Sequence, residues 1–234
     1  MRILLVGHGR MGRLVESLAA EHGCEVAGIV EIDNAARLAS GLAPEWGPVD
    51  AAVDFSFPDA VRANLPALAR LGVNVVVGTT GWLADEPAMR AIVADAGIGV
   101  VVAANFSTGV VLFEAIVAEA AGLFAAREEF GAWIHEAHHQ MKRDAPSGTA
   151  LTLRRALEQA GYARRIDVAS TRAGHTPGTH TIGFDGPAES ITLSHAARDR
   201  SAFARGALVA ARWIQHKRGW YTMRDVLGVG IRNS

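Results

Sequence analysis

The 234-residue sequence contains one cysteine, few aromatic residues (6%) and a formal net charge of only -1. A single cysteine, Cys24, excludes an intramolecular disulfide framework and a cysteine-rich zinc module. The nearly balanced charge argues against a general nucleic-acid binder, which is usually basic. No apolar run approaches the ~20 residues of a membrane-spanning helix, and the apolar run at the start is too short for a secretory signal. We therefore expect a cytoplasmic protein that binds neither nucleic acid nor membrane.

Half of the residues are hydrophobic and 20% are charged, as in an ordinary globular protein. In the first half, short apolar runs alternate with amphipathic stretches. The runs lie at 3–6, 26–30, 50–55, 73–77 and 98–102, with helical spacing at 13–21, 58–71 and 85–96. Such runs, separated by helices, are typical of parallel strands buried on both faces. Residues 1–106 are therefore predicted to form a doubly wound, Rossmann-type α/β domain.

The pattern changes after residue 106. Helices are predicted at 110–124, 147–160 and 203–216, and β-like segments at 132–134, 166–171, 179–184 and 190–195. A polar, histidine-rich loop is expected after residue 134, and residues 221–228 form a closing tail. Consecutive strands without helices between them indicate antiparallel pairing, and so a second, smaller domain of the α+β class.

A glycine-rich turn lies between the first predicted strand and the first predicted helix. Gly7, Gly9 and Gly12 fit the G-x-G-x-x-G pattern, in which glycines permit a tight turn and a close approach of a pyrophosphate. Glu31 lies 19 residues after Gly12, where a carboxylate accepts hydrogen bonds from the adenosine ribose. This pattern predicts a nicotinamide dinucleotide. Glu31 favours NADH because it repels a 2′-phosphate, although Arg37 leaves NADPH open. The alternative is a plain turn followed by an unrelated surface glutamate.

Two further loops follow predicted strands, Gly-Thr-Thr-Gly at 78–81 and Ala-Ala-Asn-Phe at 103–106. Ligands of doubly wound sheets bind beyond the carboxyl ends of the strands. Both loops are therefore expected to face the cofactor, although either would also suit an ordinary turn.

The segment 135–150 combines histidines and basic side chains with a predicted helix start. Its candidate functional residues are His138, His139, Lys142, Ser147 and Thr149. Either hydroxyl, together with the free amides of the helix start, is suited to a carboxylate, and His138 or Lys142 is suited to proton transfer. We expect a small anionic substrate held beside a proton donor. The alternative is a solvated polar loop.

The same segment matches H-E-x-x-H, the zinc-protease pattern, at 135–139. That interpretation requires a helix, whereas Trp133 and Ile134 indicate a strand, and the Pro-Ser-Gly sequence at 146–148 limits any helix to two turns. Lys142 and Arg143 also disfavour a dication. We therefore expect no bound metal, with a zinc peptidase as a remaining alternative.

With these motifs, the sequence resembles the dihydrodipicolinate (4-hydroxy-tetrahydrodipicolinate) reductase family of lysine and diaminopimelate synthesis. The resemblance covers essentially the whole chain. It rests on the His-His-x-x-Lys-x-Asp-x-Pro-Ser-Gly-Thr-Ala run at 138–150, on 78–80 and 103–107, and on Met-Arg-Asp-Val-Leu at 223–227. It implies NADH- or NADPH-dependent reduction of 4-hydroxy-tetrahydrodipicolinate, a small cyclic dicarboxylate.

Together, the motifs and the resemblance predict the site residues. The residues expected to transfer protons are His138 and Lys142. The residues expected to hold substrate are His139, Ser147, Gly148, Thr149 and Thr80. The residues expected to bind the cofactor are Gly7, His8, Gly9, Arg10, Met11, Gly12, Glu31, Gly78, Thr79, Thr80, Ala103, Ala104, Asn105 and Phe106.

The resemblance also implies a domain arrangement. Residues 200–234 would return to complete the dinucleotide-binding domain, and 107–199 would form the substrate-binding and oligomerisation domain of a homotetramer. Two departures from the family are visible. The turn at 7–12 is one residue shorter than the usual form, and the stretch between His175 and His195 is shorter than in many members. The second departure affects the segment that builds the family's subunit interface.

Two other functions remain open. A related two-domain amino-acid dehydrogenase, such as an aspartate dehydrogenase, would share the cofactor domain. We do not expect it to carry both the His-His-x-x-Lys and the Pro-Ser-Gly-Thr motifs. A non-catalytic NAD(H) sensor would bind the cofactor but would make no use of the basic loop.

Overall fold

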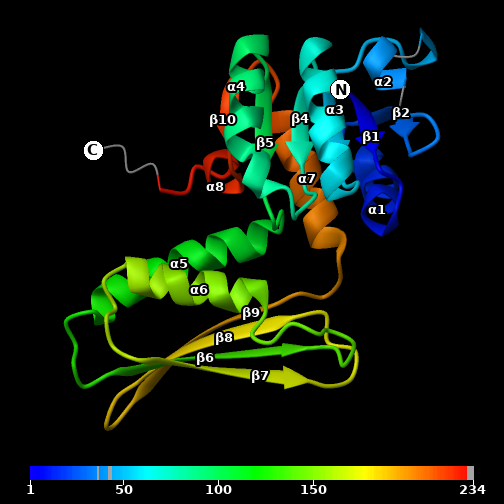
Figure 1. Cartoon of the computed structure of the whole chain (residues 1–234). Helices are drawn as coiled ribbons and strands as arrows, with labels where there is room; N and C mark the ends of the chain where they lie inside the picture. Colours follow the sequence, from blue (N-terminus) through cyan, green and yellow to red (C-terminus); the bar gives the residue numbers. More distant parts are fainter. Residues whose placement is uncertain (36, 42–43, 231–234) are drawn as a thin grey trace. The chain divides into compact units, whose positions relative to one another are not determined.

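The computed structural model describes residues 1–35, 37–41 and 44–230. The chain divides into two compact units, labelled by element in Figure 1. The first unit comprises Met1–Thr108 and Ser201–Ser234, and the second comprises Gly109–Arg200. Within the described ranges, we find no helix with the length and apolar character needed to cross a membrane.

The first unit is built on a six-stranded sheet in the order β10-β5-β4-β3-β1-β2, with every pairing parallel. Its strands are β1 (Arg2–Val6), β2 (Glu25–Val30), β3 (Ala51–Asp54), β4 (Asn74–Val77), β5 (Gly99–Val102) and β10 (Gly219–Tyr221). Its longer helices are α1 (Arg10–Ala19), α3 (Pro58–Arg70), α4 (Glu86–Ala96) and α7 (Ser201–Trp213). Short helices are α2 (Arg37–Ser40) and α8 (Met223–Val226), with 3-10 turns at Ala20–His22, Pro44–Trp46 and Leu83–Asp85.

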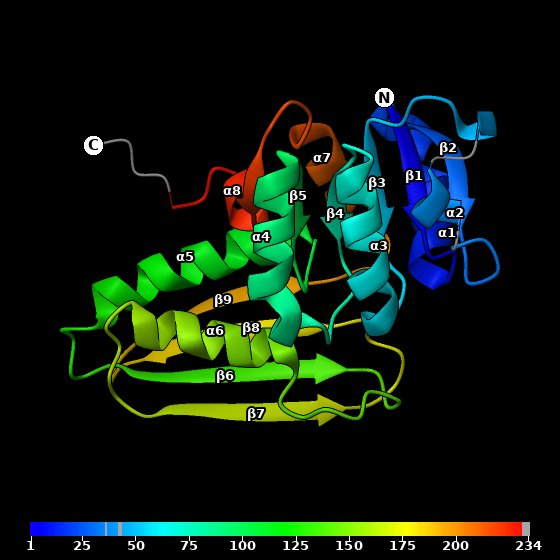
Figure 2. The same cartoon turned by 45° about the horizontal axis from the view of Figure 1, so that its top comes forward.

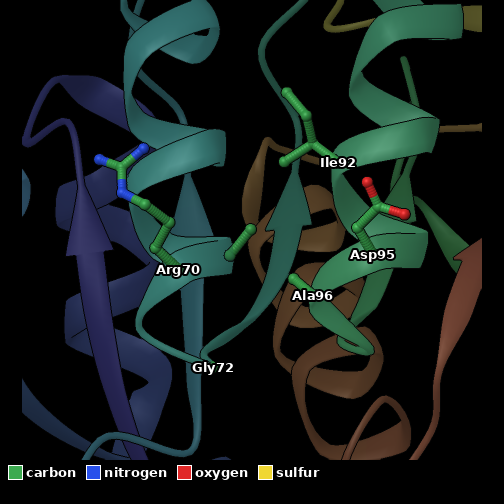
Figure 3. A pocket seen from close by; sticks show the side chains of 6 residues that line it. Arg70, Gly72, Ile92, Asp95 and Ala96 are labelled. Atoms are coloured by element: carbon green, nitrogen blue, oxygen red, sulfur yellow. The ribbon is translucent and has the colours of Figure 1, made fainter.

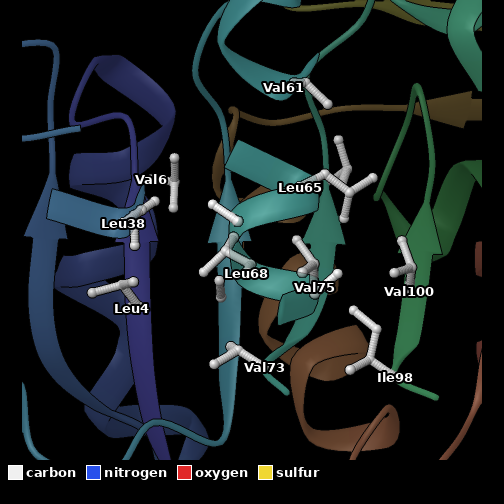
Figure 4. Close-up of a cluster of buried hydrophobic side chains, with 14 of the residues drawn as sticks. Leu4, Val6, Leu38, Val61, Leu65, Leu68, Val73, Val75, Ile98 and Val100 are labelled. Atoms are coloured by element: carbon white, nitrogen blue, oxygen red, sulfur yellow. The ribbon is translucent and has the colours of Figure 1, made fainter. Parts of the chain in front are cut away.

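Both faces of this sheet are buried. Leu4 and Val6 of β1 join a cluster with Leu65 and Leu68 of α3, shown in Figure 4. The intervening residues of β1 are equally buried and point to the opposite face. The helices α3 and α4 lie side by side (Figure 2), whereas α7 packs against α1, β3 and β4. The predicted doubly wound fold is therefore confirmed.

The structure corrects the predicted elements in three places. The strand β10 was missed, and the chain from residue 221 was predicted as a tail. Three residues are too few to show a periodic pattern, and the partner strand β5 is distant in sequence. The helix α1 begins at Arg10 rather than at residue 13, and α7 covers Ser201–Trp213 rather than 203–216.

The second unit is a four-stranded sheet in the order β7-β6-β8-β9, covered by two helices (Figure 2). Its elements are α5 (Thr108–Phe124), β6 (Gly131–His138), α6 (Gly148–Gln159), β7 (Ile166–Arg172), β8 (Thr179–Asp185) and β9 (Ser190–Ala196). The core joins Phe113 and Val117 of α5 with Leu153 of α6 and the strand residues Ile134 and Phe184. The helices therefore bury one face of the sheet.

The pairing in this sheet is mixed: the predicted antiparallel pairing of consecutive strands is confirmed for β8 and β9, whereas β6 lies between β7 and β8. β8 is antiparallel to both β6 and β9, but β6 and β7 are parallel because the chain between them crosses over through α6. β6 also extends to His138 instead of ending near residue 134. Its last residues were assigned to a loop because they are polar, although Glu136 and His138 are buried.

Candidate functional site

Four segments that follow strands of the first unit meet at one edge of its sheet. The linking main-chain hydrogen bonds run from Gly7 N to Val30 O (2.8 Å), Phe55 N to Val6 O (2.9 Å), Gly78 N to Asp54 O (2.8 Å) and Ala103 N to Val77 O (3.2 Å). Each donor is the first residue beyond a strand. The glycine turn and the loops at 78–81 and 103–106 therefore share the carboxyl edge, where doubly wound sheets bind ligands.

The glycine turn needs two of its glycines for packing and leaves the third open. Gly7 has a φ of +87°, and a Cβ there would lie 2.6 Å from Phe55 O. A Cβ on Gly12 would lie 2.2 Å from Gly7 O, whereas one on Gly9 would meet no atom within 4 Å. Gly9 precedes α1, which has no side-chain cap. An open glycine before uncapped helix amides fits a dinucleotide pyrophosphate.

The charged residues around this turn have distinct partners. Glu31 is exposed directly after β2, and its amide donates to Asn34 Oδ1 (2.7 Å). Arg37, which left NADPH open in the sequence, forms an ion pair with Glu45 (3.0 Å). His8 Nε2 lies 2.7 Å from Glu16 Oε2, while Arg10 is exposed. The Glu31 carboxylate is thus accessible, and the nearby arginine is already paired.

A buried carboxylate supports the loop at 78–81 from inside. Asp54 Oδ1 accepts hydrogen bonds from Ser56 N (2.9 Å), Ser56 Oγ (2.6 Å) and Thr79 Oγ1 (2.9 Å). Burial raises the pKa of Asp54, and hydrogen bonds from Ser56, Thr79 and Asn64 oppose that rise. The Thr79 hydroxyl therefore faces the interior, whereas Thr80 is exposed. Asp54 was not predicted as a site residue, although its place at the end of a predicted strand is a usable signal.

Phe55 covers the other side of this loop. A Cβ on Gly78 would lie 2.1 Å from the Phe55 ring, which also contacts the Phe106 ring at a centroid distance of 6.1 Å. Phe106 is buried, Ala104 is exposed, and Asn105 Oδ1 accepts from Ser107 N (2.8 Å). The Phe55 ring therefore packs against both the loop at 78–81 and the loop at 103–106.

A hollow between α3 and α4, shown in Figure 3, lies away from this edge. Its lining residues are Ala69, Arg70, Gly72, Ile92, Asp95 and Ala96. Gly72 precedes β4 and Ala96 precedes β5, so the hollow lies toward the amino ends of these strands. We assign no function to it.

In the second unit, strand geometry separates the residues of the H-E-x-x-H match. His135 lies on β6 and His139 lies just beyond its end. Residues four apart along a strand are about 13 Å apart, whereas the zinc-protease pattern needs them one helical turn apart. His135 Nε2 instead lies 2.9 Å from Thr171 Oγ1 on the neighbouring strand. The expectation that this pattern lies outside a helix is confirmed.

Glu136 is fully buried and lies at the centre of a hydrogen-bond network. Arg172 donates to it through Nη2 (2.6 Å) and Nη1 (3.0 Å), Ser147 N donates to it (3.3 Å), and His138 Nδ1 forms a short contact with Oε2. Burial alone would raise the pKa of Glu136. Hydrogen bonds from Arg172, Ser170 and His138 outweigh burial and lower it to about 2. Glu136 is therefore a buried anion at neutral pH.

His138 and His180 lie beside this carboxylate. Their rings meet edge to face with centroids 5.1 Å apart, and His180 Nε2 lies 3.1 Å from Ser147 Oγ. Burial, with the charge of His138, lowers the pKa of His180 to about 4, so that ring is neutral. Ligand atoms of Glu136, His138 and His180 lie within 4.8 Å of one another, close enough to hold a metal ion. Because Arg172 bonds to both Glu136 oxygens, this chemistry favours a hydrogen-bond network over a cation site.

The loop after β6 and the start of α6 hold the remaining predicted residues. Lys142 Nζ donates to both carboxylate oxygens of Asp144, at 2.8 Å each. Ser147 is the buried N-cap of α6, and its hydroxyl accepts from Ala150 N (3.2 Å). Its side chain therefore faces the interior, while Gly148 is exposed and Thr149 is half-buried. His139 is also half-buried, with its amide donating to Thr176 O (2.8 Å).

The structure thus brings His138 and Lys142 into one charged cluster. The Lys142 charge acts on His138, and the Asp144 carboxylate interacts with both the Lys142 ammonium and the Gly148 amide. Glu136 and Arg172 also belong to this cluster, although neither was predicted from the sequence. Glu136 appeared only as part of the disfavoured zinc pattern, and Arg172 comes from a strand distant in sequence.

Two family models together match almost the entire chain. The family model described as "Dihydrodipicolinate reductase, N-terminus" matches residues 1–106, and "Dihydrodipicolinate reductase, C-terminus" matches residues 109–227. A 4-hydroxy-tetrahydrodipicolinate reductase from Christiangramia forsetii is 33% identical over 244 residues, covering 100% of both chains. One from Bradyrhizobium diazoefficiens is 37% identical over 268 residues, covering 98% of both.

Solved structures share the fold. A dipicolinate-bound dihydrodipicolinate reductase from Paenisporosarcina sp. TG-14 has a TM-score of 0.79 and 20% identity, covering 95% of this chain and 97% of that one. A probable dehydrogenase from Thermotoga maritima has a TM-score of 0.61 and 12% identity, covering 98% and 93%. At these identities the similarity establishes the arrangement of elements only.

Proposed function

Since the chain belongs to the dihydrodipicolinate reductase family, we propose that it reduces 4-hydroxy-tetrahydrodipicolinate to tetrahydrodipicolinate in the diaminopimelate route to lysine. The main support is similarity to relatives named for this activity over 98–100% of both chains. The cluster of His138, Lys142 and the exposed start of α6 supplies the chemistry that such a substrate requires.

In this proposal the first unit binds the cofactor. A reduced nicotinamide dinucleotide supplies the hydride when it is bound. Residues 7–12 hold the pyrophosphate, Glu31 accepts from the adenosine ribose, and the loops at 78–80 and 103–106 line the nicotinamide side. We propose a preference for NADH, because Glu31 is exposed and Arg37 is paired with Glu45.

The second unit holds the dicarboxylate. Lys142 and His139 attract its carboxylates, and the exposed helix start at Gly148 and Thr149 receives one of them. Positive charge at Lys142 draws electron density from the ring and so favours reduction. Lys142 or His138 then delivers the proton, a role worth ~10²–10⁴-fold in rate. Over the whole reaction the ring gains a hydride and a proton and loses its 4-hydroxyl group as water. We further propose a cytoplasmic homotetramer, as the family resemblance implies.

A coupled absorbance assay tests this function. Purified protein is mixed with enzymatically generated 4-hydroxy-tetrahydrodipicolinate, and the 340 nm absorbance of NADH, then of NADPH, is followed. We expect oxidation that requires the substrate and is faster with NADH. No oxidation with either cofactor, despite measurable NADH binding, would favour a different dehydrogenase or a sensor.

Asp144 provides a second prediction. Its carboxylate interacts with the same ammonium and helix-start amide that we assign to a substrate carboxylate, so substrate has to displace it. We expect Asp144→Asn to lower KM by about 1.5- to 5-fold, the range of an exposed ion pair. Asp167→Asn is the matched control, because it removes an exposed pair with Arg165 elsewhere on this unit. An unchanged or higher KM in Asp144→Asn would contradict the competition.

A further inference from the structure

The buried ion pair between Glu136 and Arg172 calls for an explanation beyond stability. The Glu136 side chain is 0% exposed and that of Arg172 is 17% exposed. Removing two charges from water is costly, and buried pairs often stabilise a fold no more than apolar residues of similar volume. The partners of the pair therefore indicate its role.

The first partner is His138. Glu136 and His138 are two residues apart on β6, so strand alternation places both on the same face of the sheet. The His138 Nδ1 atom contacts Glu136 Oε2, which fixes the ring and leaves Nε2 as the free nitrogen. At Gly178, a Cβ would approach within 2.9 Å of that Nε2 atom. Glycine at this position therefore allows the main chain to pack closely against the ring beside Nε2.

The second partner is the loop that carries Lys142. Arg172 Nη2 donates both to Glu136 Oε1 (2.6 Å) and to the main-chain oxygen of Asp144 (2.6 Å). Arg172 Nη1 also donates to Thr171 O (2.8 Å), which holds the guanidinium at the end of β7. One guanidinium therefore connects the carboxylate behind His138 to the backbone beside Lys142.

We propose that Glu136 and Arg172 are a positioning pair that presents His138 Nε2 for proton transfer and keeps the imidazolium form accessible in the catalytic cycle. Glu136 orients the ring through Nδ1 and balances the charge that His138 gains on protonation. Arg172 holds Glu136 and aligns the Lys142 loop with it. This inference rests on the proposed function, because it assigns His138 a proton-transfer role.

The electrostatic surroundings of His138 predict what Glu136 contributes. The charged and titratable groups around the ring are Glu136 on β6, Arg172 on β7, His180 on β8 and Lys142 in the loop, with His195 of β9 acting on His180. Burial lowers the pKa of His138, Glu136 raises it, and Lys142 and Arg172 lower it. Glu136 is thus the carboxylate that opposes burial and two cations.

The test uses Glu136→Gln in the full chain, because glutamine keeps the shape but removes the charge. We expect the proton affinity of His138, followed by NMR titration of its ring, to fall by about tenfold. The limb of the kcat pH profile that reports His138 is identified by its loss in His138→Ala. In Glu136→Gln this limb is expected to move to lower pH by about one unit, the same tenfold change. Glu136→Asp keeps the charge and is expected to restore the titration toward that of the wild type.

Glu158→Gln is the matched control, because it removes the carboxylate of an exposed ion pair with Arg154 on α6. We expect it to leave both the titration and the pH profile unchanged. If a folded Glu136→Gln protein shows the wild-type His138 titration and pH profile, the proposed positioning role is wrong. If Glu136→Gln does not fold, the position of the ring proton in the wild type decides by nitrogen NMR: a neutral His138 protonated at Nδ1 supports the pairing with Glu136, and one protonated at Nε2 overturns it. The titration needs no substrate, so failure of the reductase activity is detected separately by the absorbance assay.

Discussion

Replacement of Lys142 by methionine is expected to lower kcat/KM by about 10²- to 10⁴-fold, with kcat reduced and KM raised together. Methionine keeps an unbranched side chain but removes the ammonium group. In the proposed mechanism, KM rises because the dicarboxylate loses a cation that attracts it, and kcat falls because a proton donor is lost. Steady-state kinetics in the absorbance assay measures both constants.

The sequence provides a matched control, because it contains one other lysine, Lys217. Its ammonium lies 4.4 Å from the centre of the Trp213 ring in the first unit, where it forms a cation–π contact. Lys217→Met therefore makes the same chemical change outside the proposed site, and we expect both constants to stay unchanged. If Lys142→Met alters KM alone, Lys142 binds substrate but does not donate the proton.

Substitution of Gly206 by alanine is expected to destabilise the first unit by about 3 kcal/mol, the upper part of the usual range for overpacking. A Cβ on Gly206 of α7 would lie 1.7 Å from Phe106 O and 2.8 Å from Phe106 C. Both are backbone atoms, so no side-chain rotation relieves the overlap and α7 has to shift. Urea unfolding followed by tryptophan fluorescence suits this test, because Trp46, Trp82, Trp213 and Trp220 all lie in this unit.

Gly122→Ala is the control for the glycine-to-alanine change itself. Gly122 also lies within a helix, α5, but its Cβ would meet only Ala160 O at 3.8 Å, an ordinary contact. Because alanine is the better helix former, we expect a gain of about 0.5–1 kcal/mol, measured by circular dichroism. If Gly206→Ala and Gly122→Ala unfold at similar urea concentrations, α7 accommodates the extra methyl group and the predicted overpacking is wrong.

Local sequence patterns predicted most of the first unit. The apolar runs at 3–6 and 73–77 are strands because both sheet faces are buried, and the glycine turn follows β1 as its pattern indicates. The strand β10 was not predictable, since its three residues become a strand only by pairing with β5. The order of strands in space is likewise absent from any local pattern.

The sequence was enough to predict which residues carry the chemistry of the candidate site, but not which of them contact one another. His138 and Lys142 stand out in one short polar segment, and their types indicate proton transfer. The register that places β6 beside β7 decides that Glu136 meets Arg172, and that pairing links residues 36 positions apart. Burial then turns an apparent loop glutamate into a fixed anion, which a sequence pattern alone does not reveal.

The discontinuity of the first unit determines the order in which the protein can mature during synthesis. Gly109–Arg200 is contiguous, whereas the first unit is completed only by α7 and β10, which come from the last part of the chain. Until then β5 lacks its outer neighbour, and the sheet face against which α7 packs remains bare. A chain that ends near residue 200 therefore lacks the elements that cover this apolar surface. The dinucleotide-binding unit is the last part of the molecule to become competent.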